Sequence, residues 1–323
     1  MKNIAVFTSG GDAPGMNACI RAVVRTALYQ GRKVFGIRRG YQGMIEGDIF
    51  ELNAHDVSNI MQLGGTILRS ARSREFRTYE GRKKAYEVLK KHHIEGVVAI
   101  GGDGTFTGAH VFNNEFPGIA FVGCPGTIDN DLSGTDFTIG YDTAINTAME
   151  AIDKIKDTAN AHDRLFFIEV MGRDAGFIAM HAGLATGAEA VLVPEKQTDL
   201  STLVQVLKDC YQRKKNSSIV IVAEGDDAGG AFKIAEHVKQ HVDHYEIKVS
   251  ILGHIQRGGI PTCMERVRAS KLGMAAVEAL LEGQQNVMVG IINHQLAYTP
   301  FSEAIKDDQP IDPYMLKMVR VLN

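Results

Sequence analysis

The chain has 323 residues, of which 45% are hydrophobic and 23% charged, with a net charge of −3 at neutral pH. This balance is typical of a globular protein with room for two domains, and it gives no sign of a nucleic-acid or membrane partner. No apolar run reaches the roughly 18 residues that a membrane-spanning helix needs. The four cysteines lack metal-ligand spacing and no signal pattern is present, so we expect a reduced, cytoplasmic setting.

Short apolar runs alternate with helical patterns along the chain. The first run, Ile4–Thr8, precedes a helical stretch with Pro14 near its start and Gly31 just past its end. Further strands are expected at Val34–Ile37, Val97–Ile100, Ile119–Val122, Leu165–Val170, Ala190–Val193, Ile219–Ala223, Lys248–Leu252 and Val287–Ile292. Further helices are expected at Ala144–Ile155, Leu203–Lys214 and Arg268–Leu281, with loops at Cys124–Asp131 and Gly253–Gly259. This alternation predicts an α/β fold in which helices cover both faces of parallel sheets.

Polar, glycine-rich segments directly follow several of these strands. They are Ser9–Asp12, Gly101–Thr105, Pro125–Asp131, Met171–Asp174, Glu224–Asp227 and His254–Gly259. In parallel sheets, ligands bind outside the carboxyl ends of the strands. We therefore expect these segments to converge on a common edge or cleft.

Two of these segments have the features of phosphate-binding loops. Glycines let the backbone approach an anion, and a following helix offers unpaired N–H groups in its first turn. Gly10-Gly11-Asp12 and Gly101–Thr105 both fit, and Asp103 adds a carboxylate that can hold Mg²⁺ beside a phosphate. Neither is a Walker A motif or a Rossmann fingerprint, and each alone is equally well explained as an ordinary tight turn.

The segment Pro125–Asp131 carries two carboxylates, Asp129 and Asp131, two residues apart. One can act as a base toward a hydroxyl while the other helps to hold a metal, although capping residues of a turn would look the same. Cations that suit an anionic substrate stand at Arg72, Arg164, Arg173, Lys248, His254 and Arg257.

The motifs in this order resemble those of the phosphofructokinase family. Ser9-Gly10-Gly11-Asp12-Ala13-Pro14-Gly15-Met16-Asn17 resembles its opening loop, and four further segments follow in the family's order: Gly101–Thr105, Pro125–Asp131, Met171-Gly172-Arg173 and Leu252–Gly259. Diacylglycerol and NAD kinases also carry a Gly-Gly-Asp-Gly loop, so the five segments together, and not this one loop, carry the resemblance.

The resemblance to the bacterial, ATP-dependent members implies two Rossmann-like three-layer α/β/α domains with largely parallel sheets and an active site in the cleft between them. A larger ATP-binding domain would span 1–139 plus 253–302, and a smaller fructose 6-phosphate-binding domain 140–252 plus 303–323. The implied reaction moves the γ-phosphate of ATP to the 1-hydroxyl of fructose 6-phosphate with the help of Mg²⁺. A homotetramer is implied, because the family completes its active site across a subunit interface.

The resemblance also assigns site residues. The ATP site would comprise Gly11, Tyr41, Arg72, Ser73, Gly102, Asp103, Gly104, Thr105 and Gly108, with Asp103 and Asp131 for Mg²⁺. Catalysis would rest on Asp129 as the base, with Arg72, Thr127, Arg173 and Gly11. The sugar phosphate would contact Thr127, Ile128, Asp129, Met171, Gly172, Arg173, Glu224, His254 and Arg257, together with Arg164 and Lys248 of a neighbouring subunit.

The donor is predicted from Gly104 and Gly126. Pyrophosphate-using relatives carry Asp and Lys at these two positions, whereas two glycines leave room for a nucleotide. Two alternatives stay open: a relative that uses pyrophosphate or another sugar such as tagatose 6-phosphate, and a non-catalytic sugar-phosphate sensor. The joint presence of Asp103, Asp129 and Arg72 argues against the sensor, which needs neither metal ligand nor base.

Some positions depart from the family pattern. Lys248 replaces an Arg, and a Lys offers a point charge without a bidentate fork. The family's effector site for ADP and phosphoenolpyruvate is matched by Arg21, Arg25, Gly187, Glu189, Arg213 and Lys215. At the same site, departures occur at Ala54, Asn59, Lys156, Asn216 and Ser217. Because donors are lost, we expect phosphoenolpyruvate to bind weakly and allosteric control to be blunted.

Overall fold

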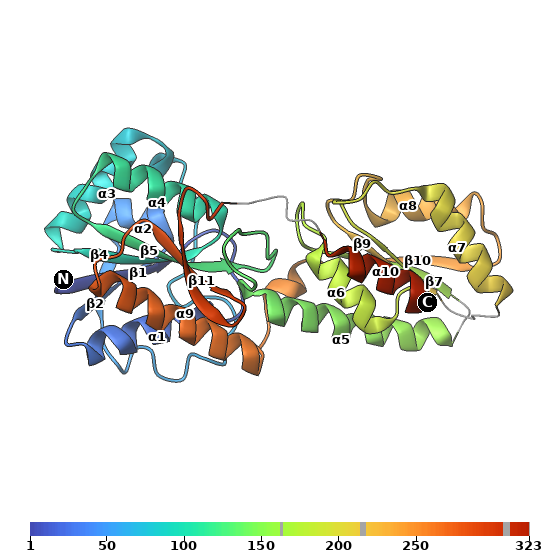
Figure 1. The fold of residues 1–323 in the computed structure, drawn as a ribbon, viewed down its shortest axis with the longest axis horizontal. Coiled ribbons are helices and arrows are strands. Elements are labelled where there is room, and N and C mark those ends of the chain that lie inside the picture. Colours follow the sequence, from blue (N-terminus) through green and yellow to red (C-terminus); the bar gives the residue numbers. More distant parts are fainter. Residues whose placement is uncertain (162–163, 214–217, 306–310, 323) are drawn as a thin grey trace. The chain divides into compact units, whose positions relative to one another are not determined.

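The computed structural model describes residues 1–161, 164–213, 218–305 and 311–322. The chain divides into two compact units (Figure 1). Unit 1 comprises residues 1–128, 132–143 and 257–307, and unit 2 comprises residues 129–131, 144–256 and 308–323. The ligand assignments and boundaries expected for two domains stay predictions.

Unit 1 is built on a sheet whose strand order is β12-β11-β5-β4-β1-β2-β3, with a short β6 paired to β5. Its strands are β1 (Asn3–Thr8), β2 (Lys33–Ile37), β3 (Ile49–Leu52), β4 (Gly96–Gly101), β5 (Ala120–Thr127), β6 (Ile139–Gly140), β11 (Val287–Ile292) and β12 (Gln295–Pro300). The inner strands pair in parallel, while β3 and β12 pair antiparallel at the edges. The unit is therefore a largely parallel sheet.

Helices cover both faces of this sheet, as Figure 1 shows for α1 and α9 on one side and α2, α3 and α4 on the other. They are α1 (Met16–Tyr29), α2 (Gly40–Glu46), α3 (Tyr79–Lys91), α4 (Asp103–Glu115) and α9 (Cys263–Leu281). In α1 the periodic residues Ile20, Val23, Val24 and Ala27 are all fully buried, as their spacing predicts. The core on the opposite face is rich in phenylalanine, and Phe7, Phe106, Phe112 and Phe121 are inaccessible to solvent.

Unit 2 contains a fully parallel sheet with strand order β10-β7-β9-β8. Its strands are β7 (Arg164–Val170), β8 (Ala190–Leu192), β9 (Ser218–Ala223) and β10 (Glu246–Ile251). Its helices are α5 (Tyr141–Asn160), α6 (Phe177–Thr186), α7 (Leu200–Gln212), α8 (Gly230–Lys239) and α10 (Pro313–Leu322). Leu203, Leu207, Ile234 and Val238 from α7 and α8 bury their side chains against β7 and β9. The predicted α/β architecture is confirmed.

The expected strands all form, but two expectations about their surroundings are wrong. The segment predicted as a loop from Cys124 is strand as far as Thr127, because Gly126 and its neighbours pair with β4 and β6. The predicted loop Gly253–Gly259 contains a 3₁₀ helix, η2 (Gly253–Arg257). Val287–Ile292, the last strand expected, is followed by β12 and α10, which were not predicted. In the described part of the chain, we find no helix with the length and apolarity to cross a membrane.

A buried carboxylate ties α9 to the start of α5 within unit 1. Glu265, only 1% exposed, accepts hydrogen bonds from the Gly140 N–H at 2.8 Å and from the Thr143 N–H and hydroxyl at 3.1 and 3.2 Å. Thr262 caps α9 by accepting from the Glu265 N–H at 3.1 Å. Burial raises the pKa of Glu265 to about 7, although the N–H groups of Gly140 and Thr143 lower it.

We predict that Glu265 makes the stability of unit 1 depend on pH. An unfolded glutamate has a pKa of about 4.3, so its folded-state pKa is raised, and its stabilising contribution is full below about pH 4.3. That contribution is lost as the pH rises toward about 7. Glu265→Gln removes the titrating group. It also replaces the oxygen that accepts from the Thr143 N–H with an amide N–H₂ group, and the lost hydrogen bond lowers the free energy of unfolding by about 1–3 kcal/mol.

Urea unfolding of wild type and Glu265→Gln across this pH range measures the effect. The midpoint of the variant should lie furthest below wild type at the acidic end, and the two should approach each other as the pH rises. A gap that is constant or widens with pH would contradict the assignment.

Candidate active site

The two glycine-rich loops of unit 1 meet at one edge of its sheet. Strands β1, β4 and β5 are neighbours, so their carboxyl ends lie side by side. The Ser9 N–H donates to the Ile100 carbonyl oxygen at 3.0 Å, which links the end of β1 to β4. A Cβ added to Gly101 would lie 2.6 Å from the Ser9 carbonyl oxygen. Only a glycine at this position allows the two loops to approach so closely.

The first turn of α4 opens onto the same edge. The helix begins at the half-buried Asp103, directly after Gly102. A Cβ added to Gly104 would meet no atom within 4 Å, so open space lies beside Gly104 in the first turn of α4. An anion suits such a helix end, and a carboxylate beside it suits a Mg²⁺ that keeps water and phosphate ligands. The residues present thus fit a magnesium-bound polyphosphate.

Asp103 and Asp131 do not belong to a preformed metal cage. Within the described residues, no group of three or more His, Cys, Asp or Glu side chains is arranged to hold a metal ion. Mg²⁺ commonly binds through one or two carboxylates together with the phosphates of its substrate. The predicted metal ligands therefore stay a prediction that depends on a bound nucleotide.

Several residues predicted to contact a nucleotide lie together beside α4. The Tyr41 hydroxyl donates to the Thr105 carbonyl oxygen at 2.5 Å, and a Cβ added to Gly108 would lie 3.1 Å from the Tyr41 ring. Tyr41 stacks on Phe76 with 3.9 Å between ring centroids, and the Ser73 hydroxyl accepts from the Phe76 N–H. Burial raises the pKa of Tyr41, which therefore stays a neutral hydrogen-bond donor.

The loop that leads to Arg72 is fastened to the start of α1. Asn17, 1% exposed, donates to the Leu63 carbonyl oxygen at 3.1 Å and accepts from the Ile67 N–H at 2.8 Å. The Thr8 hydroxyl donates to the Arg69 carbonyl oxygen at 2.9 Å. These bonds fix the loop as far as Arg69, three residues before the exposed Arg72.

Arg257 lies against the first glycine-rich loop. A Cβ added to Gly11 would come within 2.5 Å of a terminal guanidinium nitrogen of Arg257. The same nitrogen donates a long bond, 3.4 Å, to the Asp12 carbonyl oxygen. The structure therefore brings a residue predicted for the sugar phosphate beside one predicted for ATP.

The acidic loop after β5 is buried although it is polar. Thr127 ends β5, and its carbonyl oxygen accepts from the Thr138 hydroxyl at 2.6 Å. Asp129 is 4% and Asp131 5% exposed, and Asn130 between them adopts a left-handed conformation with φ 55°. Ile128 is fully buried. A carboxylate held in such a shielded position interacts more strongly with nearby charge than one in water.

In unit 2 the predicted sugar-binding residues gather where β7 and β9 end. The Arg173 N–H donates to Glu224 Oε1 at 2.7 Å, and the Met171 N–H donates to Gln256 at 3.3 Å. Arg173 is left-handed with φ 54°, and Gly172 has φ 143°, where an added Cβ would lie 2.3 Å from the Ala175 carbonyl oxygen. The irregular backbone thus depends on Gly172 and on the carboxylate of Glu224.

Arg164 and Lys248 lie away from this edge. Arg164 is the first residue of β7, whereas Met171 follows the last. With seven residues in β7, the two ends are about 20 Å apart at about 3.3 Å per residue. Arg164 Nε and Lys248 Nζ both contact the Glu246 carboxylate, at 2.7 and 2.6 Å. His254 is an exposed residue of η2, past the opposite end of β10.

Comparison with known proteins identifies the family. A sequence model described as phosphofructokinase matches residues 3–280. The chain belongs to the phosphofructokinase family. It is 53% identical to an ATP-dependent 6-phosphofructokinase of Bacteroides thetaiotaomicron over 100% of this chain and 99% of that protein.

Solved structures of the family agree with this assignment. A phosphofructokinase of Saccharomyces cerevisiae matches 100% of this chain with a TM-score of 0.91 and 34% identity, and this chain spans 48% of the yeast chain. A pyrophosphate-dependent phosphofructokinase of Marinobacter aquaeolei matches 100% of this chain and 91% of that one, with a TM-score of 0.84 and 25% identity. The family fold thus occurs with a different donor, and the donor has to be inferred from individual residues.

The residues predicted for the family's effector site fall into two groups. In unit 1, Arg21 is half-buried in α1, and Arg25 donates to the Ala54 carbonyl oxygen at 3.0 Å. In unit 2, Lys156 donates to the Thr186 carbonyl oxygen at 2.5 Å, directly before Gly187. Lys215 and Ser217, with Asn216 between them, lie outside the described residues.

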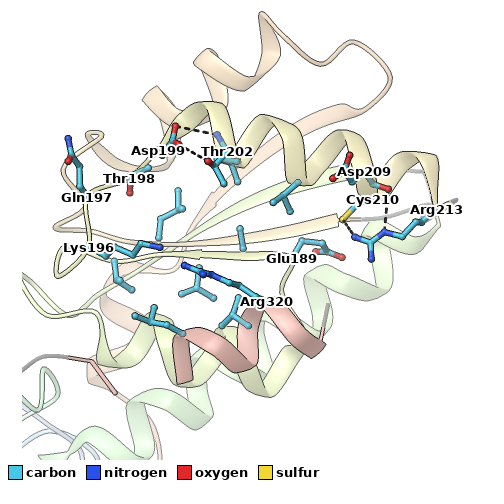
Figure 2. A pocket seen from close by; sticks show the side chains of 18 residues that line it. Glu189, Lys196, Gln197, Thr198, Asp199, Thr202, Asp209, Cys210, Arg213 and Arg320 are labelled. Atoms are coloured by element: carbon cyan, nitrogen blue, oxygen red, sulfur yellow. Dashed lines mark hydrogen bonds between the residues drawn. The ribbon is translucent and has the colours of Figure 1, made fainter. Parts of the chain in front are cut away.

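Glu189 and Arg213 line a pocket of unit 2 with a volume of about 660 Å³. Figure 2 shows these two residues near one end of the pocket, which α7, β8 and α10 enclose. Glu189 is 9% exposed and accepts from the Ile219 N–H at 2.6 Å. The carboxylate of Glu189 is thus engaged in positioning β9, and the pocket also receives Arg320 from α10.

Sequence reasoning missed three residues that organise these sites. Asn17 and Glu265 lie within or beside recognised motifs, but their bonds join segments far apart in the chain. Glu246 lies two residues before the predicted strand Lys248–Leu252, and only because β10 begins at Glu246 does it share a face with Lys248. The pairing of β10 with β7 brings Arg164 to the same place.

Proposed function

We propose that this phosphofructokinase transfers the γ-phosphate of ATP to the 1-hydroxyl of fructose 6-phosphate, giving fructose 1,6-bisphosphate and ADP. The observation that carries the proposal is the open helix end at Gly102–Gly104, which faces the Ser9–Asp12 loop on the same sheet edge. The 53% identity to an ATP-dependent 6-phosphofructokinase over the whole chain supports it. A cytoplasmic location stays a prediction.

The proposed ATP site lies at the carboxyl edge of the unit 1 sheet. Backbone amides at the start of α4 and in the Ser9–Asp12 loop would receive the phosphates, and Tyr41 and Gly108 would line the nucleotide side. Asp103, with Asp131, would hold Mg²⁺, which when bound supplies positive charge next to the reacting phosphate oxygens. The half-buried position of Asp103, next in the chain to Gly104 with its open surroundings, supports this role.

The proposed catalytic groups stabilise a transition state with dispersed negative charge. Phosphoryl transfer passes through a loose transition state, so positioning and cations account for most of the rate enhancement. Asp129 would accept the proton of the sugar 1-hydroxyl, while Arg72 and Arg173 would stabilise the phosphoryl group in transit. Thr127 and the Gly11 amide would help to orient the transferred group.

The small residues at two positions favour ATP over pyrophosphate as the donor. A side chain at Gly104 would extend into the open space that the proposed nucleotide needs. At Gly126 an added Cβ would lie 3.0 Å from Met16 and 3.2 Å from the Gly101 N–H, so a larger side chain would crowd the loop. Activity with tagatose 6-phosphate in place of fructose 6-phosphate would test the alternative sugar.

We predict that Asp129→Asn lowers kcat by about 10²–10⁴-fold while the affinity for fructose 6-phosphate changes little, because the amide cannot accept the proton. Initial rates with Mg²⁺ and fructose 6-phosphate, in the presence of ATP or pyrophosphate, test both the reaction and the donor. Wild type should be active with ATP and inactive with pyrophosphate. No turnover with either donor would favour the sensor alternative, and near-normal turnover of the variant would remove Asp129 from the role.

The position of Arg164 and Lys248 supports an active site that is shared between two copies of the chain. Arg164 begins β7, about 20 Å from Met171 along the strand, and Lys248 contacts the same Glu246 carboxylate as Arg164 does. One sugar phosphate a few ångströms long cannot contact both ends of this strand. The 6-phosphate would therefore be held by His254 and Arg257 of one subunit and by Arg164 and Lys248 of another, in the proposed homotetramer.

A hybrid of two inactive variants tests this arrangement. Asp129→Asn removes the base, and Arg164→Ala removes a phosphate contact. When the two variants are unfolded together and reassembled, some sites should receive Asp129 from one chain and Arg164 from another. We predict that the mixture regains up to about a quarter of wild-type activity, if two variants at equal concentration mix at random and each site draws on two chains. Activity equal to the sum of the separate variants would contradict the shared site.

We also propose that the effector site for ADP and phosphoenolpyruvate is weakened. Ala54 stands where the family has an Arg, and Arg25 bonds to its carbonyl oxygen instead of lying beside a second cation. Lys156, in place of another Arg, donates to the Thr186 carbonyl oxygen. Fewer cations remain for an anionic effector than in the family pattern.

We expect phosphoenolpyruvate to inhibit only at high concentration. Rates at subsaturating fructose 6-phosphate should stay nearly constant while phosphoenolpyruvate is titrated through the micromolar range at neutral pH. The substitution Ala54→Arg should increase the inhibition by restoring a donor. Strong inhibition of the wild type at micromolar phosphoenolpyruvate would contradict the proposal.

A further inference from the structure

Glu246 holds the two cations that the proposed function assigns to the 6-phosphate. Its Oε2 accepts from Arg164 Nε at 2.7 Å, and its Oε1 lies 2.6 Å from Lys248 Nζ. Each carboxylate oxygen thus takes one cation. In the sheet, Glu246 is the direct register partner of Arg164, and Lys248 follows two residues later on the same face of β10.

The Glu246 carboxylate lowers the net positive charge that an anion encounters at this cluster. Arg164 and Lys248 alone present two positive charges, whereas the three side chains together present a single net positive charge. Lys248 and Glu246 are 44% and 50% exposed, so an anion from solvent or from another subunit can reach them. The hydrogen bonds from Lys248 and then Arg164 lower the pKa of Glu246 to about 2, and the carboxylate is charged at neutral pH.

A phosphate and this carboxylate draw on the same two cations. The protons of Arg164 Nε and of the Lys248 ammonium that face Glu246 are unavailable to a second acceptor, and the carboxylate repels a phosphate dianion held a few ångströms away. Against this, Glu246 keeps the two cations from repelling each other and limits their rotation. Its pairs are exposed, and exposed pairs contribute little. The repulsion of a doubly charged ligand is therefore the larger effect.

We propose that Glu246 competes with the sugar 6-phosphate for Arg164 and Lys248 and thereby sets the affinity of the enzyme for fructose 6-phosphate. The inference rests on the proposed function, which gives Arg164 and Lys248 their role. Glu246 does not contact the reacting atoms, so its influence falls on substrate binding and not on phosphoryl transfer.

Steady-state kinetics of the full-length Glu246→Gln variant test the proposal. The KM for fructose 6-phosphate should fall by about threefold or more, because a like charge is removed beside the phosphate. The kcat and the KM for ATP should stay within about twofold of wild type. Glu51→Gln is the matched control, since Glu51 is an exposed strand residue that pairs with Lys33 at 3.8 Å in unit 1. This control should leave all three constants unchanged.

A binding measurement separates this inference from the proposed function. Inorganic phosphate, titrated calorimetrically into the protein, should bind Glu246→Gln more tightly than wild type by the same factor as the KM changes. The gain should be smaller, but still present, in a Lys248→Met, Glu246→Gln double variant compared with Lys248→Met, because one of the two cations is gone while the carboxylate still repels the phosphate directly; a gain of undiminished size would show that Glu246 does not compete for Lys248.

The outcomes are distinguishable. A wild type without kinase activity would overturn the proposed function, and phosphate binding would still report on Glu246. An active wild type whose KM for fructose 6-phosphate is unchanged in Glu246→Gln would overturn the inference alone. A KM that rises in the variant would also overturn it, since Glu246 would then position the cations in favour of the phosphate.

Discussion

The close approach of backbone at the carboxyl edge of the unit 1 sheet is the constraint on which the proposed ATP site depends. Gly101 would place a Cβ 2.6 Å from the Ser9 carbonyl oxygen, and Gly126 would place one 3.2 Å from the Gly101 amide. Three neighbouring strands can therefore end within contact distance of one another. Glycines at these positions leave the backbone accessible beside the open position at Gly104, and accessible backbone amides suit an anionic polyphosphate.

Buried polar side chains hold the irregular segments around that edge. Loops carry backbone groups without a ladder partner, and such groups need hydrogen bonds when they are shielded from water. Asn17 satisfies the loop before Arg72, and Glu265 satisfies the start of α5. The side chains that satisfy these backbone donors and acceptors also hold the loop that leads to Arg72, a residue proposed to act on the substrate.

The charged cluster near the amino end of the unit 2 sheet is formed by strand pairing. Arg164 and Lys248 are brought together by strand pairing, and a third side chain, Glu246, balances them. In one chain this cluster is remote from Met171, because β7 separates them. The proposed shared active site would give this cluster a phosphate to bind, and the proposed role of Glu246 rests on that proposal.

The sequence by itself determined the α/β class, the strands and the glycine-rich loops. Short apolar runs and helical apolar patterns are local, and the positions of Gly101, Asp103 and Asp129 after strands follow from their place in the chain. It did not predict that β5 would continue through Gly126, because glycine and proline are typical of turns and the pairing with β4 is not local. Tertiary structure alone decided the partners of Asn17 and Glu265 and the pairing of Glu246 with Arg164. Each of these side chains bonds to residues dozens of positions away, and only the packing of strands and helices sets which distant groups come within hydrogen-bond reach.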